Sequence, residues 1–382
     1  MMRDTIPADE ILTHAAAVGQ YYGFTPLTVL TQKSRGTMRP AEPNALSGLA
    51  LDPIAQTVAS FVKQLQRTDS EPNIRRPVFV WHTNIAPGRI APKKAIVQFH
   101  AIGTDRPLSD TLIMRAMLVL IRELFGEEPV IRVNSMGDKE TRARYTRELG
   151  TYFRKHADSL PSDCTERAKD NAVEAAKMVV TRACADDLPV PTEHLSDASR
   201  RRFEELLEYL EMTETPYELA RDLISMGGAW SETCFEITVR DRRVAWGSRY
   251  SDLAKHLLGA ATPAVGVVLQ INSSGIVSTQ PAAKRAARVR FAFVHIGDEA
   301  KRLSIELAEH FRKARLPLLQ NIGVESLTEQ LILAERHACP YMIVMGRKEA
   351  LEHCAILRDL RTQQETVVPL AKLVEELRSV TA

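Results

Sequence analysis

The chain has 382 residues, enough for two or three domains, and its 45 % hydrophobic and 26 % charged composition is typical of a globular protein. A net charge of +2 excludes a whole-chain electrostatic attraction to nucleic acid, so any nucleic-acid surface must be a local patch. No apolar run approaches the roughly 18 residues of a membrane helix, and residues 1–10 lack the apolar core of a signal peptide, which predicts a cytoplasmic protein.

The cysteines and histidines do not form a metal-binding pattern. The five cysteines contain no Cys-x-x-Cys pair and their number is odd, which favours reduced thiols over a disulfide framework or a zinc site. The ten histidines contain no His-Glu-x-x-His pattern. The sequence therefore predicts no metal site.

The first third of the chain is predicted to contain two helices, a hairpin and a third helix. Apolar residues at helical spacing precede Gly23, which is suited to end a helix. A polar, proline-rich stretch follows and is predicted to be a loop. The predicted elements are a helix and a strand within residues 8–32, a loop at 32–47, a helix at 51–66, paired strands at 77–81 and 95–99, and a helix at 109–125.

Residues 129–156 are predicted to form a strand, a tight turn and an amphipathic helix. Val130 and Ile131 are β-branched and lie in a short apolar run. Gly137 can adopt the positive φ of a turn, and Asp138 offers a carboxylate that can cap the helix. One face of that helix is apolar, at i, i+4 and i+7 spacing.

The rest of the chain changes from helical to alternating structure. The clearest helices of the charge-rich region are predicted at 168–182 and 196–210. A break rich in serine, with glycine and proline, at 273–281 predicts a domain boundary, after which strands and helices alternate as in a largely parallel sheet. The later predicted elements are strands at 235–239, 244–246, 265–271, 289–296, 318–319 and 341–345, and helices at 250–258, 299–313, 328–337 and 367–380.

Four segments of the sequence resemble a known family. Residues 134–138, Asn-Ser-Met-Gly-Asp, resemble the Asn-Ser-x-Gly-Asp segment of histidyl-tRNA synthetases. Residues 235–250 and 263–266 also resemble the histidyl enzymes. Residues 326–346 resemble the anticodon-binding domain that the histidyl, prolyl, threonyl and glycyl synthetases share. The matches occur in the same order as in the family, which indicates common ancestry.

The resemblance implies an α/β fold: a class II synthetase antiparallel-sheet core with flanking helices, a small helical insertion, and a C-terminal α/β anticodon-binding-type domain. Residues 22–27 are similar to motif 1, which builds the dimer interface of class II enzymes, so a homodimer is implied. The implied divisions are a first part of the core at 1–160, the insertion at 161–213, a second part of the core at 214–275, a linker at 276–288 and the anticodon-binding-like domain at 289–382.

The family's phosphate-binding arginines are absent from the aligned positions. Adenylate formation depends on positioning and charge neutralisation, and a planar guanidinium can form two hydrogen bonds with phosphate. The motif 2 arginine aligns with Val80, the motif 3 arginine with Ser273, and the arginine of the histidyl signature with Ser225. Each lost contact costs roughly 2–4 kcal/mol of transition-state binding, so the three losses would remove most of the activity.

Some pocket positions of the family retain plausible residues. In the functional interpretation, they form a small-molecule pocket with altered specificity. In the structural interpretation, Tyr250 packs beneath the sheet and Arg249 pairs with Glu236 or Asp252. The pocket candidates are Gln98, Trp230, Arg249 and Tyr250.

The C-terminal region has an excess of basic residues that could meet the phosphates of a tRNA anticodon stem. A solvated surface of mixed charge is the alternative. The basic pair that follows Ser-Leu in the family is Thr328-Glu329 here, which argues against recognition of the histidine anticodon. The tRNA-binding candidates are Arg288, Arg347, Lys348, Arg358 and Arg361.

The leading hypothesis is a histidyl-tRNA-synthetase-like protein that is non-catalytic or weakly active and acts by binding tRNA, a metabolite or a regulatory protein partner. The regulatory subunit of ATP phosphoribosyltransferase is a non-catalytic relative of this kind. The alternative is a working histidine–tRNA ligase, which would use ATP and Mg²⁺. The sequence names neither the ligand, the tRNA nor the partner.

Overall fold

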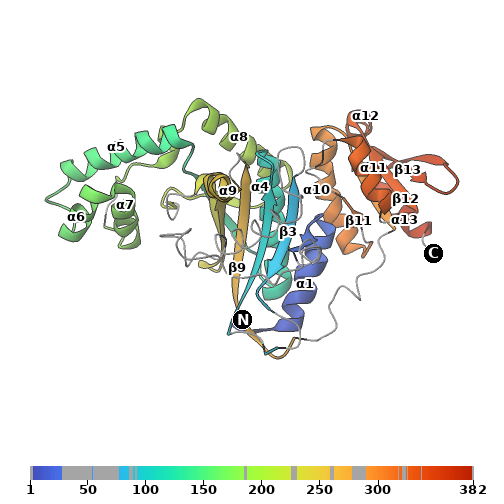
Figure 1. The fold of residues 1–382 in the computed structure, drawn as a ribbon, viewed down its shortest axis with the longest axis horizontal. Helices are drawn as coiled ribbons and strands as arrows, with labels where there is room; N and C mark the ends of the chain where they lie inside the picture. Colours follow the sequence, from blue (N-terminus) through green and yellow to red (C-terminus); the bar gives the residue numbers. More distant parts are fainter. Residues whose placement is uncertain are drawn as a thin grey trace.

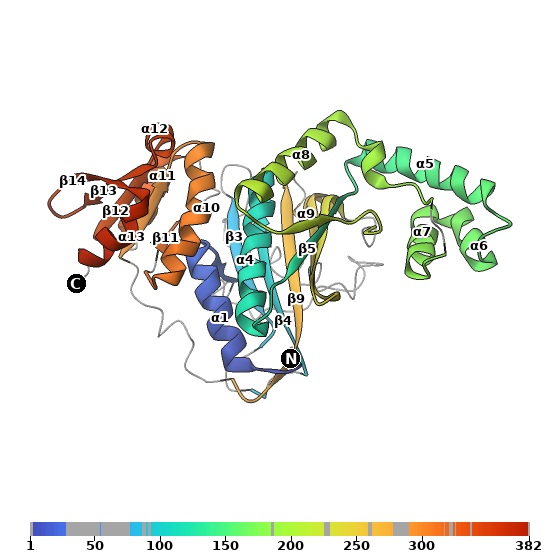
Figure 2. The same ribbon diagram turned by 180° about the vertical axis from the view of Figure 1, so that it is seen from behind.

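The structure is a computed structural model that describes residues 3–27, 54, 77–85, 89–90, 93–184, 187–224, 230–258, 262–277, 290–316, 318–320, 324, 326–336 and 338–380. The predicted loop at 32–47, the predicted helix at 51–66 apart from Ile54, and most of the predicted linker at 276–288 lie outside these residues. Figures 1 and 2 show a central sheet with a helical lobe on one side and a C-terminal α/β unit on the other. None of the described helices is long and apolar enough to cross a membrane.

The central sheet is antiparallel through its middle. Its nine strands have the order β2-β3-β4-β9-β8-β7-β5-β6, and β1 pairs with β9. Every neighbouring pair from β3 to β5 is antiparallel, as predicted for the class II core. The strands are β1 (Ile6–Pro7), β2 (Thr25–Pro26), β3 (Val78–Thr83), β4 (Lys94–Ile102), β5 (Val130–Ser135), β6 (Tyr217–Leu219), β7 (Ser231–Val239), β8 (Arg242–Arg249) and β9 (Ala264–Ser274).

Helices cover one face of this sheet. Phe99, Val267 and the residues that alternate with them point into a single apolar core, which they share with three helices. Figure 2 shows two of these, α1 and α4, in front of the strands. The three helices are α1 (Ala8–Tyr21), α4 (Pro107–Phe125) and α8 (Asp197–Met212), and the short helix α9 (Ser251–Leu258) contacts β9.

The strand, turn and helix predicted at 129–156 are confirmed as β5 and α5 (Lys139–Lys155). Gly137 adopts a φ of 61°, and the Asp138 side chain accepts a hydrogen bond from the backbone N–H of Thr141 at 2.8 Å. Tyr145 and Leu149 on the apolar face of α5 are fully buried, and this face packs against the helices that follow, α6 and α7. The Asp138 carboxylate therefore stabilises the first turn of α5.

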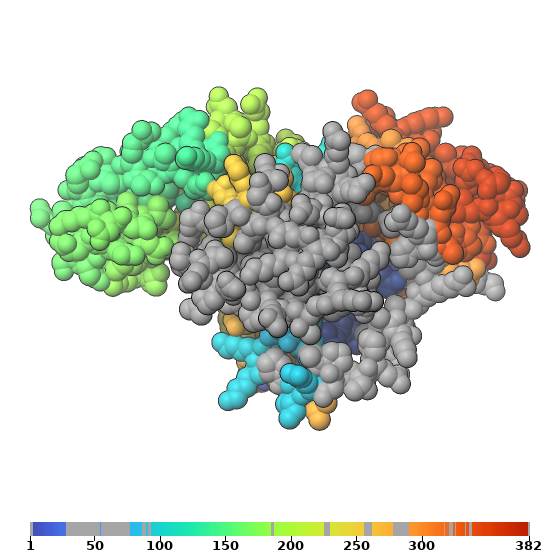
Figure 3. Space-filling view, in the orientation of Figure 1, coloured from blue at the N-terminus to red at the C-terminus, as the bar shows by residue number. Residues whose placement is uncertain are grey.

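The helical lobe consists of α5, α6 (Ser162–Asp170) and α7 (Ala172–Thr181), and Figure 3 shows it projecting from the core. The single helix predicted at 168–182 is wrong, because the chain breaks at Asn171. Asn171 has extended φ and ψ angles. Its side-chain oxygen accepts a hydrogen bond from the backbone N–H of Glu174 at 3.1 Å, and this bond caps α7. A 3-10 turn (Pro191–His194) then leads to α8.

The C-terminal unit contains a five-stranded sheet with the order β11-β10-β12-β13-β14. The largely parallel sheet predicted here is wrong for half of the pairings: β10 is parallel to β11 and β12, but β13 is antiparallel to β12 and to β14. The hairpin of β13 and β14 was missed, and residues 367–369 extend β14 instead of beginning the last helix. The elements are β10 (Phe291–His295), α10 (Asp298–Lys313), β11 (Leu318–Leu319), α11 (Leu327–Arg336), β12 (Tyr341–Met345), α12 (Arg347–Leu351), β13 (Cys354–Asp359), β14 (Glu365–Pro369) and α13 (Leu370–Ser379).

The C-terminal unit docks on the core through α10. The Arg312 guanidinium pairs with Glu123 of α4 at 2.6 Å and with Glu309 at 2.8 Å. The Gln320 side-chain amide donates to the backbone carbonyl of Tyr21 at 3.0 Å. The Arg312–Glu123 pair and the Gln320–Tyr21 hydrogen bond join the two parts, and Glu309 of α10 holds Arg312 in place.

Candidate functional site

The face of the central sheet opposite α1 and α4 carries the polar side chains that the sequence suggested. Strand residues alternate between faces, so Gln98 and His100 of β4 lie on the same side as Val80 of β3 and Val268 of β9. Val80 and Val268 belong to an apolar cluster on this face that also contains Trp230 and Tyr250. The strands therefore bring three of the four pocket candidates to one region.

His100 joins these side chains into a buried chain of hydrogen bonds. Its Nε2 atom lies 2.9 Å from Oε1 of Gln98, and its Nδ1 atom lies 3.0 Å from the hydroxyl of Tyr250. The Trp230 ring meets the Tyr250 ring edge-on at 6.1 Å between centroids. We refer to Gln98, His100, Trp230 and Tyr250 as the His100 cluster.

The His100 cluster is electrically neutral. Burial lowers the pKa of His100 to about 3, and nearby His82 contributes to this shift. Burial also lowers the pKa of His82 to about 4 and raises the pKa of Tyr250. At neutral pH the cluster offers hydrogen bonds and aromatic faces, but no positive charge that could bind a phosphate.

A glycine provides the space for His100. A Cβ atom on Gly266 would lie 2.6 Å from His100 Nδ1 and 3.0 Å from the Tyr250 ring. Such contacts are shorter than van der Waals distance, so a larger residue would push the imidazole away from its partners.

We therefore expect Gly266→Ala to lower the free energy of unfolding by about 1–3 kcal/mol, because an overpacked core must shift its side chains. Urea denaturation measures the change. Gly150→Ala is the matched control, because its Cβ would meet only Arg154 Nη1 at 3.9 Å; in the α5 interior it should be stabilising by about 0.5–1 kcal/mol. Equal stability of Gly266→Ala and the wild type would contradict this packing.

Two of the positions aligned with the family's phosphate-binding arginines, Val80 and Ser273, lie far apart. Val80 is 1 % exposed and packs in the apolar cluster. It lies directly opposite His100 in the pairing of β3 with β4. Ser273 lies seven residues beyond Gly266 on β9, about 23 Å along the strand and on the opposite face. Ser225, the third aligned position, lies outside the described residues.

Arg249, the fourth pocket candidate, lies on the helix-covered face of the sheet, away from the His100 cluster. It is 1 % exposed, and its guanidinium pairs with the fully buried Asp110 of α4 at 2.5 Å. It also donates to the backbone carbonyls of Thr104 and Arg106, both at 3.1 Å. The predicted pairing with Glu236 or Asp252 is wrong.

Other arginines take those two carboxylates. Arg132 pairs with Glu236, and Arg142 pairs with Asp252 at 2.8 Å. Arg142 also donates to the backbone carbonyl of Trp230 at 2.9 Å. Arg142, which contacts Trp230 of the His100 cluster, is therefore already matched by an acid.

The tRNA-binding candidates of the C-terminal unit fall into two separate groups. Arg347 and Lys348 begin α12, just beyond the end of β12. Arg358 pairs with Glu365 at 3.6 Å and lies beside the start of β12, where its strand partner is Met342. Arg361 follows in the adjoining turn, and Arg288 lies outside the described residues.

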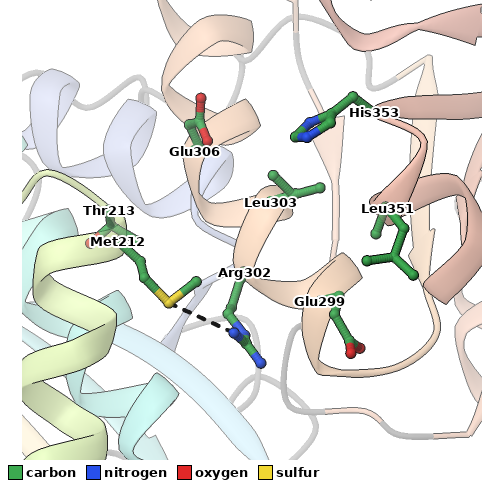
Figure 4. Close-up of a pocket in the computed structure, with 9 residues that line it drawn as sticks. Met212, Thr213, Glu299, Arg302, Leu303, Glu306, Leu351 and His353 are labelled. Atoms are coloured by element: carbon green, nitrogen blue, oxygen red, sulfur yellow. Dashed lines mark hydrogen bonds between the residues drawn. The ribbon is translucent and has the colours of Figure 1, made fainter.

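A hollow with a volume of about 230 Å³ lies at the junction between the core and the C-terminal unit (Figure 4). Met212 at the end of α8 and Arg302 of α10 line it, and Arg302 donates to the Met212 sulfur at 3.7 Å. Leu351 of α12 closes another side. None of the residues predicted to form a site lines this hollow.

The sequence interpretation missed His100 and His82. The signal was present, because His100 lies two residues after Gln98 and therefore on the same face of a strand. No described group of three or more histidine, cysteine, aspartate or glutamate side chains could hold a metal ion. Within the described chain, the site thus consists of neutral hydrogen-bonding groups and aromatic rings.

Comparison with known proteins identifies the class. Residues 289–380 match the anticodon binding domain family, so the C-terminal unit is an anticodon-binding domain. The chain is 25 % identical over 301 residues to the histidine–tRNA ligase of Halothermothrix orenii, covering 74 % of this chain and 71 % of the relative. Identity with the enzyme of Dehalococcoides mccartyi is 26 % over 293 residues, 73 % of this chain and 69 % of the relative.

The chain is thus similar to the histidyl-tRNA synthetases, which are class II enzymes, over about three quarters of its length. Among solved structures, the apo histidyl-tRNA synthetase of S. aureus aligns over 98 % of this chain and 97 % of its own, with 19 % identity and a TM-score of 0.49. A structure from Bacillus halodurans, described as an ATP phosphoribosyltransferase regulatory subunit/histidyl-tRNA synthetase, aligns over 90 % of this chain and 97 % of its own, with 15 % identity and a TM-score of 0.40.

Proposed function

We propose that this histidyl-tRNA-synthetase-like protein does not aminoacylate efficiently and acts through binding of tRNA, a metabolite or a protein partner. The observation that carries the proposal is the apolar burial of Val80, the position aligned with the motif 2 arginine. A buried valine cannot neutralise the charge that develops on a phosphate in adenylate formation.

The charge of the His100 cluster supports the same proposal. Its imidazole is neutral at physiological pH, and Arg249, which could have supplied charge, is held by Asp110 on the other face of the sheet. These groups do not fit the triphosphate of ATP. Gln98, His100, Trp230 and Tyr250 are each at most 4 % exposed, so the cluster offers neither the charge nor the accessible surface that a phosphate contact needs.

The proposal is tested by histidine-dependent ATP–pyrophosphate exchange in the presence of Mg²⁺. Loss of even two phosphate contacts of roughly 2 kcal/mol each predicts exchange about 1,000-fold slower than that of an authentic histidyl-tRNA synthetase assayed in parallel. A cooperative unfolding transition of the same sample controls for folded protein. Exchange at the rate of the authentic enzyme would establish the alternative, a working histidine–tRNA ligase that uses ATP and Mg²⁺.

We also propose a homodimer and a cytoplasmic location for the protein. The homodimer is supported by the similarity of residues 22–27 to motif 1, and β2 within this segment forms the edge of the central sheet. The location is supported by the absence of a membrane-spanning helix among the described elements and by free, mostly buried cysteines.

A further inference from the structure

Three side chains of α10 form a row along the hollow at the junction with the core. Glu299, Leu303 and Glu306 are spaced i, i+4 and i+7, which places them on one face of the helix. Figure 4 shows Leu303 in the middle of the hollow, with Glu306 towards one end and Glu299 towards the other. The two glutamates are seven positions, or about 10 Å, apart along the helix axis.

Apolar side chains of two other helices complete the lining. Ala350 and Leu351 of α12 line one side of the hollow, and Met212 of α8 lines it from the core. Leu351 is 66 % exposed and Met212 is 52 % exposed. Exposed apolar side chains that gather at a concave place are typical of a surface that a ligand covers. The hollow therefore combines an apolar middle with a carboxylate at each end.

Both carboxylates are available to a ligand. Glu306 is exposed and has no ion pair among the residues that the structure describes. Glu299 meets Arg347 at 3.4 Å, but the side chain of Arg347 is 76 % exposed, and exposed pairs of this kind hold their partners weakly. Each carboxylate can therefore accept charge-assisted hydrogen bonds from a bound cation.

The guanidinium of Arg302, which also lines the hollow, is directed towards the core. It lies over the Tyr209 ring, 5.6 Å from the centroid, and donates to the Met212 sulfur at 3.7 Å (Figure 4). Both partners belong to α8. The positive charge of Arg302 therefore lies to the side of the row that Glu299, Leu303 and Glu306 form, and that row remains acidic.

We propose that the hollow binds a linear aliphatic diamine, with an ammonium group on Glu299, another on Glu306, and the methylene chain over Leu303. A volume of about 230 Å³ suits such a narrow molecule, because pockets for drug-sized ligands have roughly 300–1,000 Å³. The inference rests on the metabolite-binding form of the proposed function and gives that metabolite a chemical class. The hollow shares no residue with the His100 cluster.

The test is isothermal titration calorimetry of the full chain, freed of nucleic acid, with diaminoheptane as the probe. A salt concentration of about 0.1 M screens charges that are more than about 10 Å apart. Heptylamine has the same chain with a single ammonium group, and putrescine has two ammonium groups on a shorter chain. Diaminoheptane should bind at one site per chain and about tenfold more tightly than either, because each of the two loses one charge-assisted hydrogen bond.

Two variants separate the charged end from the apolar middle. Glu306→Gln should weaken diaminoheptane binding about tenfold, to the affinity of heptylamine, because a single carboxylate end remains. Leu351→Ala should weaken diaminoheptane and heptylamine alike, by about fivefold, because both lose the same apolar contact. Glu335→Gln is the matched control: it removes the same charge from an exposed residue of α11 that does not line the hollow, and it should bind like the wild type.

Three outcomes would overturn the inference. They are no binding of diaminoheptane by the wild type, equal weakening by Glu306→Gln and Glu335→Gln, and binding of putrescine as tight as that of diaminoheptane. The second would show a general attraction of cations, and the third would show that the ligand does not span the two glutamates. The result is separable from that of the exchange assay, since a chain that catalyses exchange can still bind a diamine, and a chain that does neither retains the non-catalytic assignment without this site.

Discussion

Replacing Asp110 with leucine is expected to lower the free energy of unfolding by about 3–5 kcal/mol, because the substitution leaves a buried guanidinium without its counter-charge. Asp110 is fully buried, and Arg249 is 1 % exposed. The consequence is larger here because Arg202 also lies 3.6 Å from Asp110, and burial together with Arg249 lowers the pKa of Arg202. Removing the carboxylate would leave two cations facing each other.

The measurement is urea denaturation of the wild type, Asp110→Leu and the double variant Asp110→Leu/Arg249→Met. The double variant should recover about 2 kcal/mol, since it removes the Arg249 charge and leaves only Arg202 without the carboxylate. Arg122→Gln on the same helix breaks the exposed pair with Glu128 and should cost no more than about 1 kcal/mol. A loss below about 1 kcal/mol for Asp110→Leu would mean that the pair is hydrated and not a buried anchor.

Local sequence signals were sufficient where the structure is determined by neighbouring residues. The strand, turn and helix around Gly137 and Asp138 could be predicted, because a β-branched run, a glycine with positive φ and an N-capping carboxylate all act within a few residues. The same is true of the hairpin of β3 and β4. In the structure, its register puts Gln98 on the same face as Val80.

Long-range pairing could not be predicted in the same way. Arg249 lies 139 positions from Asp110, and the carboxylates predicted to pair with it, Glu236 and Asp252, are much nearer in sequence. The antiparallel hairpin of β13 and β14 was missed because Thr366, Val367 and Val368 have the apolar, β-branched character of a strand but continue directly into a helix. Only the pairing of residues 365–369 with Cys354–Arg358 shows that they form a strand and not the start of the helix.

The sequence predicted most of the residues of the candidate site, but it did not predict that the site is uncharged. Sequence similarity indicated which positions had lost arginine, and three of the four pocket candidates do lie together around His100. The neutral state of that cluster depends on burial by Tyr250 and on the neighbouring His82, which are distant in sequence or on another strand. A sequence pattern does not contain this information.

A loss of stability in mild acid is the second large effect that we expect, and two buried histidines cause it. Burial lowers the pKa of His100 to about 3 and the pKa of His295 to about 3, and the charge of Lys301 adds to the second shift. In the unfolded chain both should titrate near a pKa of about 6.5. The unfolded state therefore takes up protons first, so stability falls as pH decreases from about 6.5 towards 3.

At pH 5 the difference in proton uptake lowers the free energy of unfolding by about 2 kcal/mol for each histidine relative to pH 7. Urea denaturation at the two pH values should show that His295→Leu and His100→Gln each remove about 2 kcal/mol of this change. His353→Gln is the control, because His353 is exposed on the surface and its replacement should leave the difference within about 0.5 kcal/mol.

His295 is the sharper of the two tests. Neither of its ring nitrogens has a hydrogen-bond partner among the described residues, so the substitution breaks no side-chain hydrogen bond. An unchanged pH dependence in His295→Leu would mean that this imidazole is protonated or hydrated in the folded protein, and that the polar atoms around β10 are satisfied in another way.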